Sequence, residues 1–480
     1  MDREPGAAPV PLTRYLDFVL LADQVKLRKG QVASFVVRVF SSPAGEGEHE
    51  VRVRWPADLA PRIGWLDRRQ IDADLGAQIE LGTVIGTMLL PIGVRGLFEA
   101  SLGRLAEDEG LRVRLRLGDA LADVPWEFAW VERHRGEPTA AGFLALDPRI
   151  SIVRHEAVAA PLPEPAPAAA GRRVVVATAS PDGYPPLPSL AAERAALGQA
   201  LDGVAGITAD VVADATPAAL LDALAAGADV FHFSGHGTPD GGVVLAGGEV
   251  VPGDRLAEMV QAKGVRLAVL GACDTGRRDD HNVWGGVAAA LVQRGVPAVV
   301  AMQFTIGDRR AAAFAGALYR ALVAGLTVDE AVALGRTAIR TVSTGAQAPT
   351  ASADVRDWVV PVLYLRDHGG RVFEPVSSTA AREEAEAGSA RLYRQRVGTV
   401  SAGGVVLGAV LEPDASAAVD QDADRVDGTM IGVLAGDEVR VDQDVEEVGT
   451  GGTVVGGADS PEALARALDA VRRMAPKDGG

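Results

Sequence analysis

The chain has 480 residues, of which 48% are hydrophobic and 23% are charged, enough for two or three globular domains and unlike an extensively disordered chain. Its net charge is −17, which disfavours a nucleic acid as partner. Its uncharged apolar stretches, such as Leu81–Val94, are too short to cross a bilayer, so we do not expect a membrane partner either. The single cysteine, Cys273, permits no intramolecular disulfide and the N-terminus lacks the apolar run of a signal peptide, which predicts a cytoplasmic protein.

In the N-terminal part, period-two alternation and apolar runs predict several strands. The predicted strands are Val32–Phe40, Val51–Trp55, Leu111–Leu117 and Phe143–Val153. The strand at 111–117 alternates apolar residues with three arginines, which predicts one buried and one solvated face.

The middle part alternates short apolar runs with amphipathic stretches. The predicted strands are Arg173–Ala179, Ile207–Val212, Asp229–Ser234, Leu267–Leu270, Ala298–Met302 and Trp358–Leu365. The predicted helices are Leu190–Leu201, Thr216–Ala226, Asp254–Lys263, Val283–Arg294, Asp308–Ala324 and Val328–Val342. This alternation predicts an α/β fold, a mostly parallel sheet with helices on both faces. In such sheets the ligand crevice lies beyond the carboxyl ends of the strands.

The C-terminal part is rich in glycine, valine and aspartate. The sequence VDQD recurs at 419–422 and 441–444, and GTV recurs at 398–400 and 452–454, which predicts a small β-rich, solenoid-like module. Aspartates at 420, 422, 424 and 427 are spaced as in a calcium loop, but Arg425 and Ile431 stand where such a loop needs glycine and glutamate. We therefore expect a solvated acidic loop, with no metal or other cofactor.

Composition breaks, including the proline-rich APLPEPAPAAAG at 160–171, divide the chain further. The expected segments are a tail (1–14), a strand-rich N-terminal half (15–158), a Pro/Ala linker (159–172), a main α/β domain (173–368), a linker (369–395), the acidic β module (396–457) and a C-terminal helix and tail (458–480).

Two predicted strand ends carry residues that can do chemistry. The strand ending at Ser234 is followed by Gly235-His236-Gly237, and the strand ending at Leu270 is followed by Gly271-Ala272-Cys273. A histidine beside a thiol can take its proton, and the main-chain N–H groups of Gly237 and Cys273 can stabilise an oxyanion. A lone cysteine is most often a small buried residue, but the joint placement at two glycine-flanked strand ends favours a Cys–His dyad.

These residues resemble the CHAT domains, caspase-like cysteine peptidases related to separase and gingipain. The resemblance rests on FHFSGHG (231–237), VLGACDTG (269–276), LRVRLRLGDALADVPWEF (111–128), GGVAAALVQRGVPAVVAMQF (285–304) and LTVDEAVALGRTAIR (326–340). It implies a caspase-like fold preceded by a smaller α+β half. It also implies Cys273 as the nucleophile, His236 as general base and acid, and Gly237 and Cys273 as the oxyanion hole. The loop 180–187 would form a wall of the substrate site.

Substrate preference does not follow from the resemblance. Relatives that prefer basic residues often carry an acid two positions before the cysteine, where this chain has Gly271. Asp274, Gln303 and Asp308 are further candidates for the substrate pocket, although each also fits a helix cap or a solvated side chain. His232 stands four residues before His236 on a strand, where that spacing spans roughly 13 Å, so we interpret it as a core residue and not a metal ligand.

The leading prediction is a regulated cysteine endopeptidase that acts on a protein or peptide, with an activating partner protein left open. One alternative is a catalytically silent caspase-like scaffold for protein–protein interaction in a signalling or defence complex. Another is thiol-based acyl transfer to or hydrolysis of a non-peptide amide, which would use the same two residues.

Overall fold

In the computed structural model the described residues lie between 12 and 458. They exclude 47–49, 72–73, 134–138, 156–171, 188–189, 203, 205–206, 239, 262, 272–282, 305, 343–355, 367–369, 373–390, 401–404, 411–416, 427–428, 435–438 and 449–452. The chain divides into two compact units, Met1–Pro375 and Val376–Gly480.

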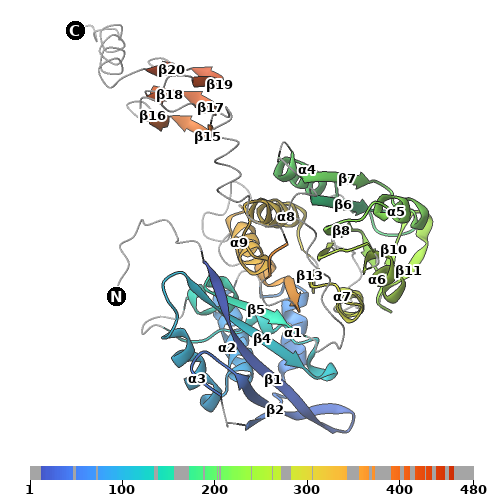
Figure 1. Cartoon of the computed structure of the whole chain (residues 1–480). Coiled ribbons are helices and arrows are strands. Elements are labelled where there is room, and N and C mark those ends of the chain that lie inside the picture. The colour runs from blue at the N-terminus through green and yellow to red at the C-terminus, as the bar shows by residue number, and fades with distance from the viewer. Residues whose placement is uncertain are drawn as a thin grey trace. The chain divides into compact units, whose positions relative to one another are not determined.

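One sheet of eleven strands runs through the first unit (Figure 1). Its order is β3-β2-β1-β4-β5-β14-β13-β12-β8-β6-β7. The strands are β1 (Arg14–Arg28), β2 (Gln31–Ser41), β3 (Glu50–Arg54), β4 (Glu109–Leu117), β5 (Ile150–Arg154), β6 (Arg172–Thr178), β7 (Ile207–Val212), β8 (Val230–Ser234), β12 (Leu267–Gly271), β13 (Ala298–Met302) and β14 (Pro361–Leu365). Three short strands, β9 (His236–Gly237), β10 (Gly242–Val244) and β11 (Val250–Pro252), form a separate small sheet.

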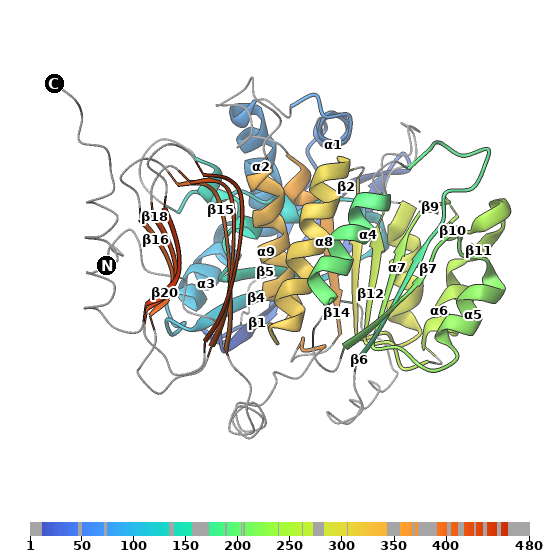
Figure 2. The ribbon, with the colours of Figure 1, turned by 90° about the horizontal axis from the view of Figure 1, so that it is seen from above.

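The helices of the main α/β part lie in two rows on opposite faces of the sheet. One row holds α5 (Pro217–Leu224), α6 (Gly253–Gln261) and α7 (Val283–Gln293), and the other holds α4 (Leu190–Leu201), α8 (Asp308–Val323) and α9 (Val328–Thr341). Figure 2 shows α9, α8 and α4 side by side. This is the predicted α/β architecture, and β6, β7, β8, β12 and β13 are all parallel.

A single seam joins the two halves of the sheet. β14 pairs antiparallel with β13 on one side and parallel with β5 on the other, with Leu363 opposite Val153. The strands of the N-terminal half therefore continue the sheet of the α/β part, so the two halves share one core.

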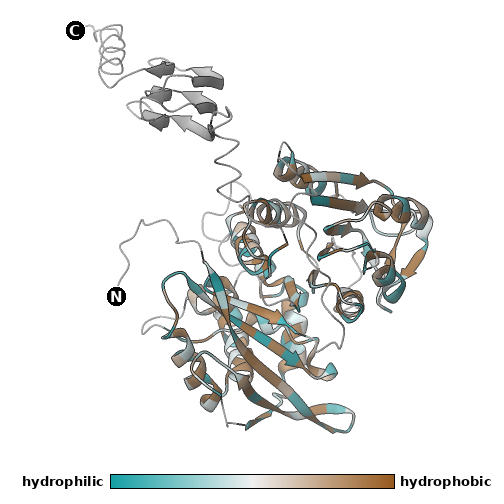
Figure 3. Ribbon diagram, viewed as in Figure 1, coloured by the Kyte–Doolittle hydropathy of each residue, from teal (hydrophilic) through white to brown (hydrophobic). Residues whose placement is uncertain are grey.

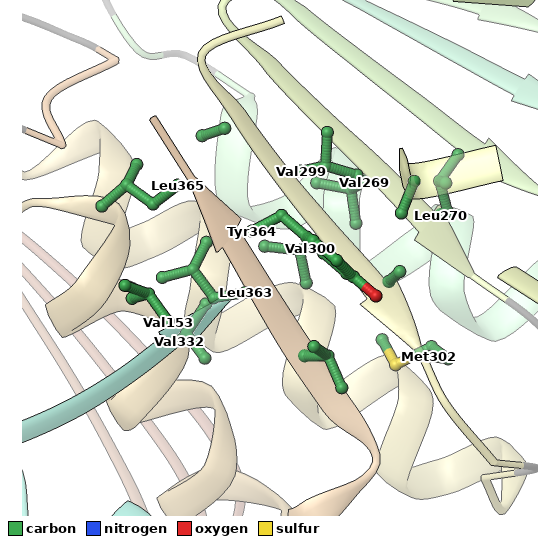
Figure 4. Packing of buried hydrophobic residues seen from close by; sticks show 14 of the residues in the cluster. Val153, Val269, Leu270, Val299, Val300, Met302, Val332, Leu363, Tyr364 and Leu365 are labelled. Carbon is green, nitrogen blue, oxygen red and sulfur yellow. The ribbon is translucent and has the colours of Figure 1, made fainter. Parts of the chain in front are cut away.

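The core of the first unit lies along this sheet, whose central strands are the most hydrophobic elements in Figure 3. Figure 4 shows aliphatic side chains of neighbouring strands packed at the seam, among them Val269, Val300 and Leu363, with Val332 of α9 beside them. Strands buried on both faces read as continuous apolar runs, which is why the sequence predicted them to within a few residues.

The N-terminal half also contains helices, as its expected α+β class requires, although the sequence analysis did not give their positions. They are α1 (Leu59–Asp67), α2 (Leu75–Leu89) and α3 (Ile92–Leu102). No single described helix is long and apolar enough to span a membrane; α2 and α3 reach that length and composition only together, and they meet at 93°.

Two expectations about this half were wrong. The arginine face of β4 is not solvated: Arg112 and Arg114 are each 1% exposed. Asp329 of α9, more than 200 residues away in sequence, forms two hydrogen bonds with the Arg112 guanidinium, at 3.1 and 2.6 Å. The covering helix thus supplies the counter-charge that lets arginine be buried.

The predicted strand over 143–153 begins only at Ile150, after short 3-10 turns at Ala140–Gly142 and Leu144–Leu146. Asp147 and Pro148 explain the late start. The Asp147 carboxylate accepts the Arg149 N–H at 2.9 Å, and proline has no N–H to donate to a ladder.

The second unit is a two-sheet parallel β-solenoid, as the short repeats predicted. One sheet has the order β15-β17-β19 and the other β16-β18-β20. The strands are β15 (Arg391–Val400), β16 (Val405–Val410), β17 (Ala417–Val426), β18 (Thr429–Leu434), β19 (Val439–Val448) and β20 (Thr453–Ala458). The two VDQD copies stack in register, Val419 opposite Val441 and Asp422 opposite Asp444. The first copy lies inside β17, so the expectation of an acidic loop there was wrong.

Candidate active site

The site lies where three parallel strands end together. β8 lies between β6 and β12, and Ser234 pairs with both Thr178 and Gly271. Just beyond these pairs the Ala179 N–H donates to the Ser234 carbonyl (3.1 Å), and the Gly235 N–H donates to the Gly271 carbonyl (3.3 Å). The three chain segments that leave the sheet here are therefore held side by side by backbone hydrogen bonds.

Glycine at 235 is required by this close approach. A Cβ atom there would lie 2.6 Å from the Phe233 ring and 3.0 Å from the Ala179 carbonyl oxygen. Any side chain would push β8 away from the end of β6. The glycine that the sequence places before His236 thus lets the chain turn between two packed strands.

His236 follows in β9, held in register by β10. It pairs with Val244 of β10, Gly237 pairs with Val243, and His236 is 2% exposed. Its Nε2 lies 2.9 Å from the Pro185 carbonyl oxygen, and its ring lies 5.2 Å from the Tyr184 ring at 35°. The loop 180–187 thus contacts the imidazole directly, on both an edge and a face.

The Pro185 contact fixes the tautomer of the ring. A carbonyl oxygen can only accept, so Nε2 carries the hydrogen and donates it. The other nitrogen, Nδ1, is then a free base, and no group of the described residues hydrogen-bonds it. Burial lowers the pKa of His236, while the Pro185 hydrogen bond opposes this shift. The lowered pKa favours the neutral form of the ring near pH 7, with Nδ1 as its unprotonated nitrogen.

A second polar cluster lies beneath Gly271. His232, fully buried in β8, contacts Tyr319 Oη through Nδ1 (3.1 Å), and Ser234 Oγ (2.8 Å) and Glu193 Oε1 (3.2 Å) through Nε2. The interpretation of His232 as a core residue is confirmed. Burial and the Glu193 charge raise the pKa of Tyr319 well above its ordinary value.

This cluster explains the glycine at 271. A Cβ atom there would meet Glu193 Oε1 and Ser234 Oγ, each at 3.2 Å. An acidic side chain at this position would be forced against the Glu193 carboxylate. An acid two positions before the cysteine would thus be both crowded and repelled at this site.

The other predicted site residues are placed as follows. Cys273 and Asp274 lie outside the described residues. Gly271 ends β12, and Asp308 is the first residue of α8. Gln303, directly after β13, is buried in a polar network: it donates to the Val359 carbonyl at 2.8 Å and accepts from Arg154 at 3.3 Å.

Three contributors to the site were missed by the sequence analysis. The Pro185 carbonyl and the Tyr184 ring come from a loop named only as a substrate wall, and Glu193 from a helix that carried no motif. The sole sequence signal was their position just after the first strand of the α/β part, which borders β8 in the sheet.

Comparisons with known proteins identify a family and several similar solved structures. The CHAT domain family model matches residues 80–365. No curated protein matched the chain. Similar solved structures include the Saccharomyces cerevisiae separase–securin complex (13% identity, TM-score 0.33, 57% of this chain and 16% of that chain) and the pro- and mature domains of Porphyromonas gingivalis RgpB (12%, 0.38, 66% and 78%). Caspase-1 from Spodoptera frugiperda is a third (12%, 0.28, 45% and 96%). The chain thus spans about a sixth of the separase chain.

Proposed function

Because the chain belongs to the CHAT domain family, the caspase-like cysteine peptidases, we propose that it is a cysteine endopeptidase that cleaves a protein substrate. The observation that carries this proposal is the state of His236: a buried, neutral imidazole whose Nε2–H is held by the Pro185 carbonyl and whose Nδ1 is unpartnered among the described residues. A general base needs this combination of fixed tautomer and open nitrogen.

The nucleophile in this proposal is Cys273. Ser234 and Gly271 are register partners on adjacent parallel strands. His236 comes two residues after Ser234, and Cys273 comes two residues after Gly271. The two residues thus follow the carboxyl ends of neighbouring strands in the sequence, which supports pairing the imidazole with the thiol. A lone cysteine needs such a base to react at neutral pH, because an ordinary thiol has a pKa of about 8.5.

The proposed reaction has two halves. In the first, His236 Nδ1 takes the thiol proton as the sulfur attacks the peptide carbonyl carbon, and the N–H groups of Gly237 and Cys273 donate to the resulting oxyanion. The oxyanion collapses, the C–N bond breaks, and the proton on Nδ1 goes to the leaving amine. In the second, Nδ1 takes a proton from water, the hydroxyl oxygen attacks the thioester, the C–S bond breaks, and the thiolate regains the proton.

The test is a comparison of new protein N-termini in native extract of the source cells, which also supplies any activating partner. The wild-type chain, Cys273→Ala and His236→Ala are added in parallel. We expect N-termini that only the wild type generates. If all three proteins give the same N-termini, the proposal of an endopeptidase is wrong and the scaffold alternative is favoured. Cleavage that persists in His236→Ala alone would overturn its role as base.

A further inference from the structure

The β-solenoid of the second unit has two different edges. Within the described residues, β15 and β19 each pair on one side only, and so do β16 and β20 of the other sheet. An edge strand with unpaired N–H and C=O groups is a template for adding another strand. In a parallel solenoid such an edge accepts the next coil of the same kind.

The residues in register across β15, β17 and β19 give these edges opposite charge. One row contains Arg394, Asp420 and Asp442. The row two residues further contains Arg396, Asp422 and Asp444. The β15 edge therefore carries two arginines, and the β19 edge carries two aspartates at the same heights along the strands.

The rows beside them repeat one kind of residue. Gln395, Gln421 and Gln443 share the row between the two charged ones, and identical glutamines stacked in register favour continued stacking. Tyr393 lies in the row of Val441, and Val397 in that of Val445. In the other sheet the rows that begin at Val406 and Leu407 end at Val454 and Val455.

We propose that this module binds a second copy of this chain head to tail, with β19 of one copy pairing in parallel with β15 of the next. Continuing the register then places Asp442 opposite Arg394 and Asp444 opposite Arg396. Gln443 continues onto Gln395. The occupant of each edge is thus the opposite edge of another copy.

The charges determine which edge of one copy pairs with which edge of the next. Within one copy Asp420 and Asp442 are neighbours of like charge, which is unfavourable, and Asp442 has no arginine in the adjacent position of its row. Head-to-tail pairing adds that arginine. Pairing two β15 edges, or two β19 edges, would oppose like charges. The contact is therefore heterologous, and where its rotation does not close a ring it generates an open filament.

This inference is independent of peptidase activity and does not require Cys273. Its consequence for the proposed enzyme is a raised local concentration of catalytic units, because each is covalently joined to a module.

The first experiment measures the mass of the full chain by sedimentation velocity from 1 to 50 µM. We expect the mass of the wild-type assembly to increase with protein concentration. Arg394→Asp/Arg396→Asp makes both edges acidic, and Asp442→Arg/Asp444→Arg makes both basic, so each variant alone should stay monomeric. Mixed 1:1, the two variants should assemble again, because every contact between them is complementary. The matched control Arg391→Asp changes an arginine of the same strand whose row ends in Val439, and should assemble as the wild type does.

A second experiment uses milder changes, in case charge reversal prevents folding. In a Cys273→Ala background, Gln395→Cys and Gln443→Cys are introduced in separate chains and oxidised mildly, alone and mixed. A disulfide-linked dimer should form in the mixture and not in either protein alone. The inference is wrong if the wild type is monomeric throughout, if the folded charge-reversed variants assemble alone or fail to assemble when mixed, or if the cysteine mixture gives no dimer.

Discussion

Asp329 offers the sharpest test of how the two halves of the large sheet are held together. Its carboxylate accepts two hydrogen bonds from Arg112, at 3.1 and 2.6 Å, and one from Ser151 Oγ at 2.5 Å, and neither Arg112 nor Asp329 is more than 2% exposed. Burial acts to lower the pKa of Arg112, but the charges of Asp329 and Asp17 and the hydrogen bonds to them together outweigh it and hold the pKa above its ordinary value. Asp329→Ala would therefore leave a charged, buried guanidinium.

Removing one partner of a buried ion pair costs about 3–5 kcal/mol, because the other charge stays buried. We expect Asp329→Ala to lower the free energy of unfolding by that amount. The matched control is Asp17→Ala in the same cluster: Asp17 lies 3.4 Å from both Arg112 and Arg114, but its side chain is 22% exposed. Water can replace it in part, and we expect a loss of about 1 kcal/mol.

Urea unfolding followed by tryptophan fluorescence measures both losses. Replacing both partners, Arg112→Met with Asp329→Leu, should recover much of the stability, because no charge is then left buried. Equal losses for Asp329→Ala and Asp17→Ala, or a loss below about 1 kcal/mol for Asp329→Ala, would refute the view that this pair joins α9 to the N-terminal strands.

Two further predictions concern the candidate site. Gly271→Asp should lower the melting temperature far more than Gly271→Ala, because it sets a second carboxylate against Glu193, and melting curves that coincide would contradict this. Tyr184→Ala should uncover His236 and return its lowered pKa toward the ordinary value of about 6.5, so the acid limb of the pH–rate profile should move to higher pH; an unmoved limb, or one moved to lower pH, would show that the ring does not desolvate the imidazole.

The sequence predicted the α/β half well because local signals there agree with the fold. α5 begins at Pro217 after the predicted cap Thr216, whose hydroxyl accepts the Ala219 N–H, and β7 and β13 have the predicted bounds. The N-terminal half was harder. Its arginines alternate as on a solvated strand, and the burial of Arg112 depends on Asp329, which is distant in sequence.

For the candidate site, too, some features could be predicted from the sequence and others could not. The strand ends that carry His236 and Cys273 follow from the order of elements and from the glycines beside them. The Pro185 carbonyl cannot be read from the sequence, because any residue has a carbonyl and only the path of the loop brings this one to Nε2. The crowding at Gly271 depends likewise on Glu193, a helix residue 78 positions earlier.

The most direct test of the central claim is the rate at which iodoacetamide alkylates Cys273 as a function of pH. Because the chain has one cysteine, alkylation at the sulfhydryl, followed by mass spectrometry of the Cys273 peptide, reports on this thiol alone. We predict that His236→Ala slows the reaction near pH 7, and that the wild-type rate falls in acid as His236 gains a proton. Identical rate–pH curves for the two proteins would show that the imidazole does not serve this thiol.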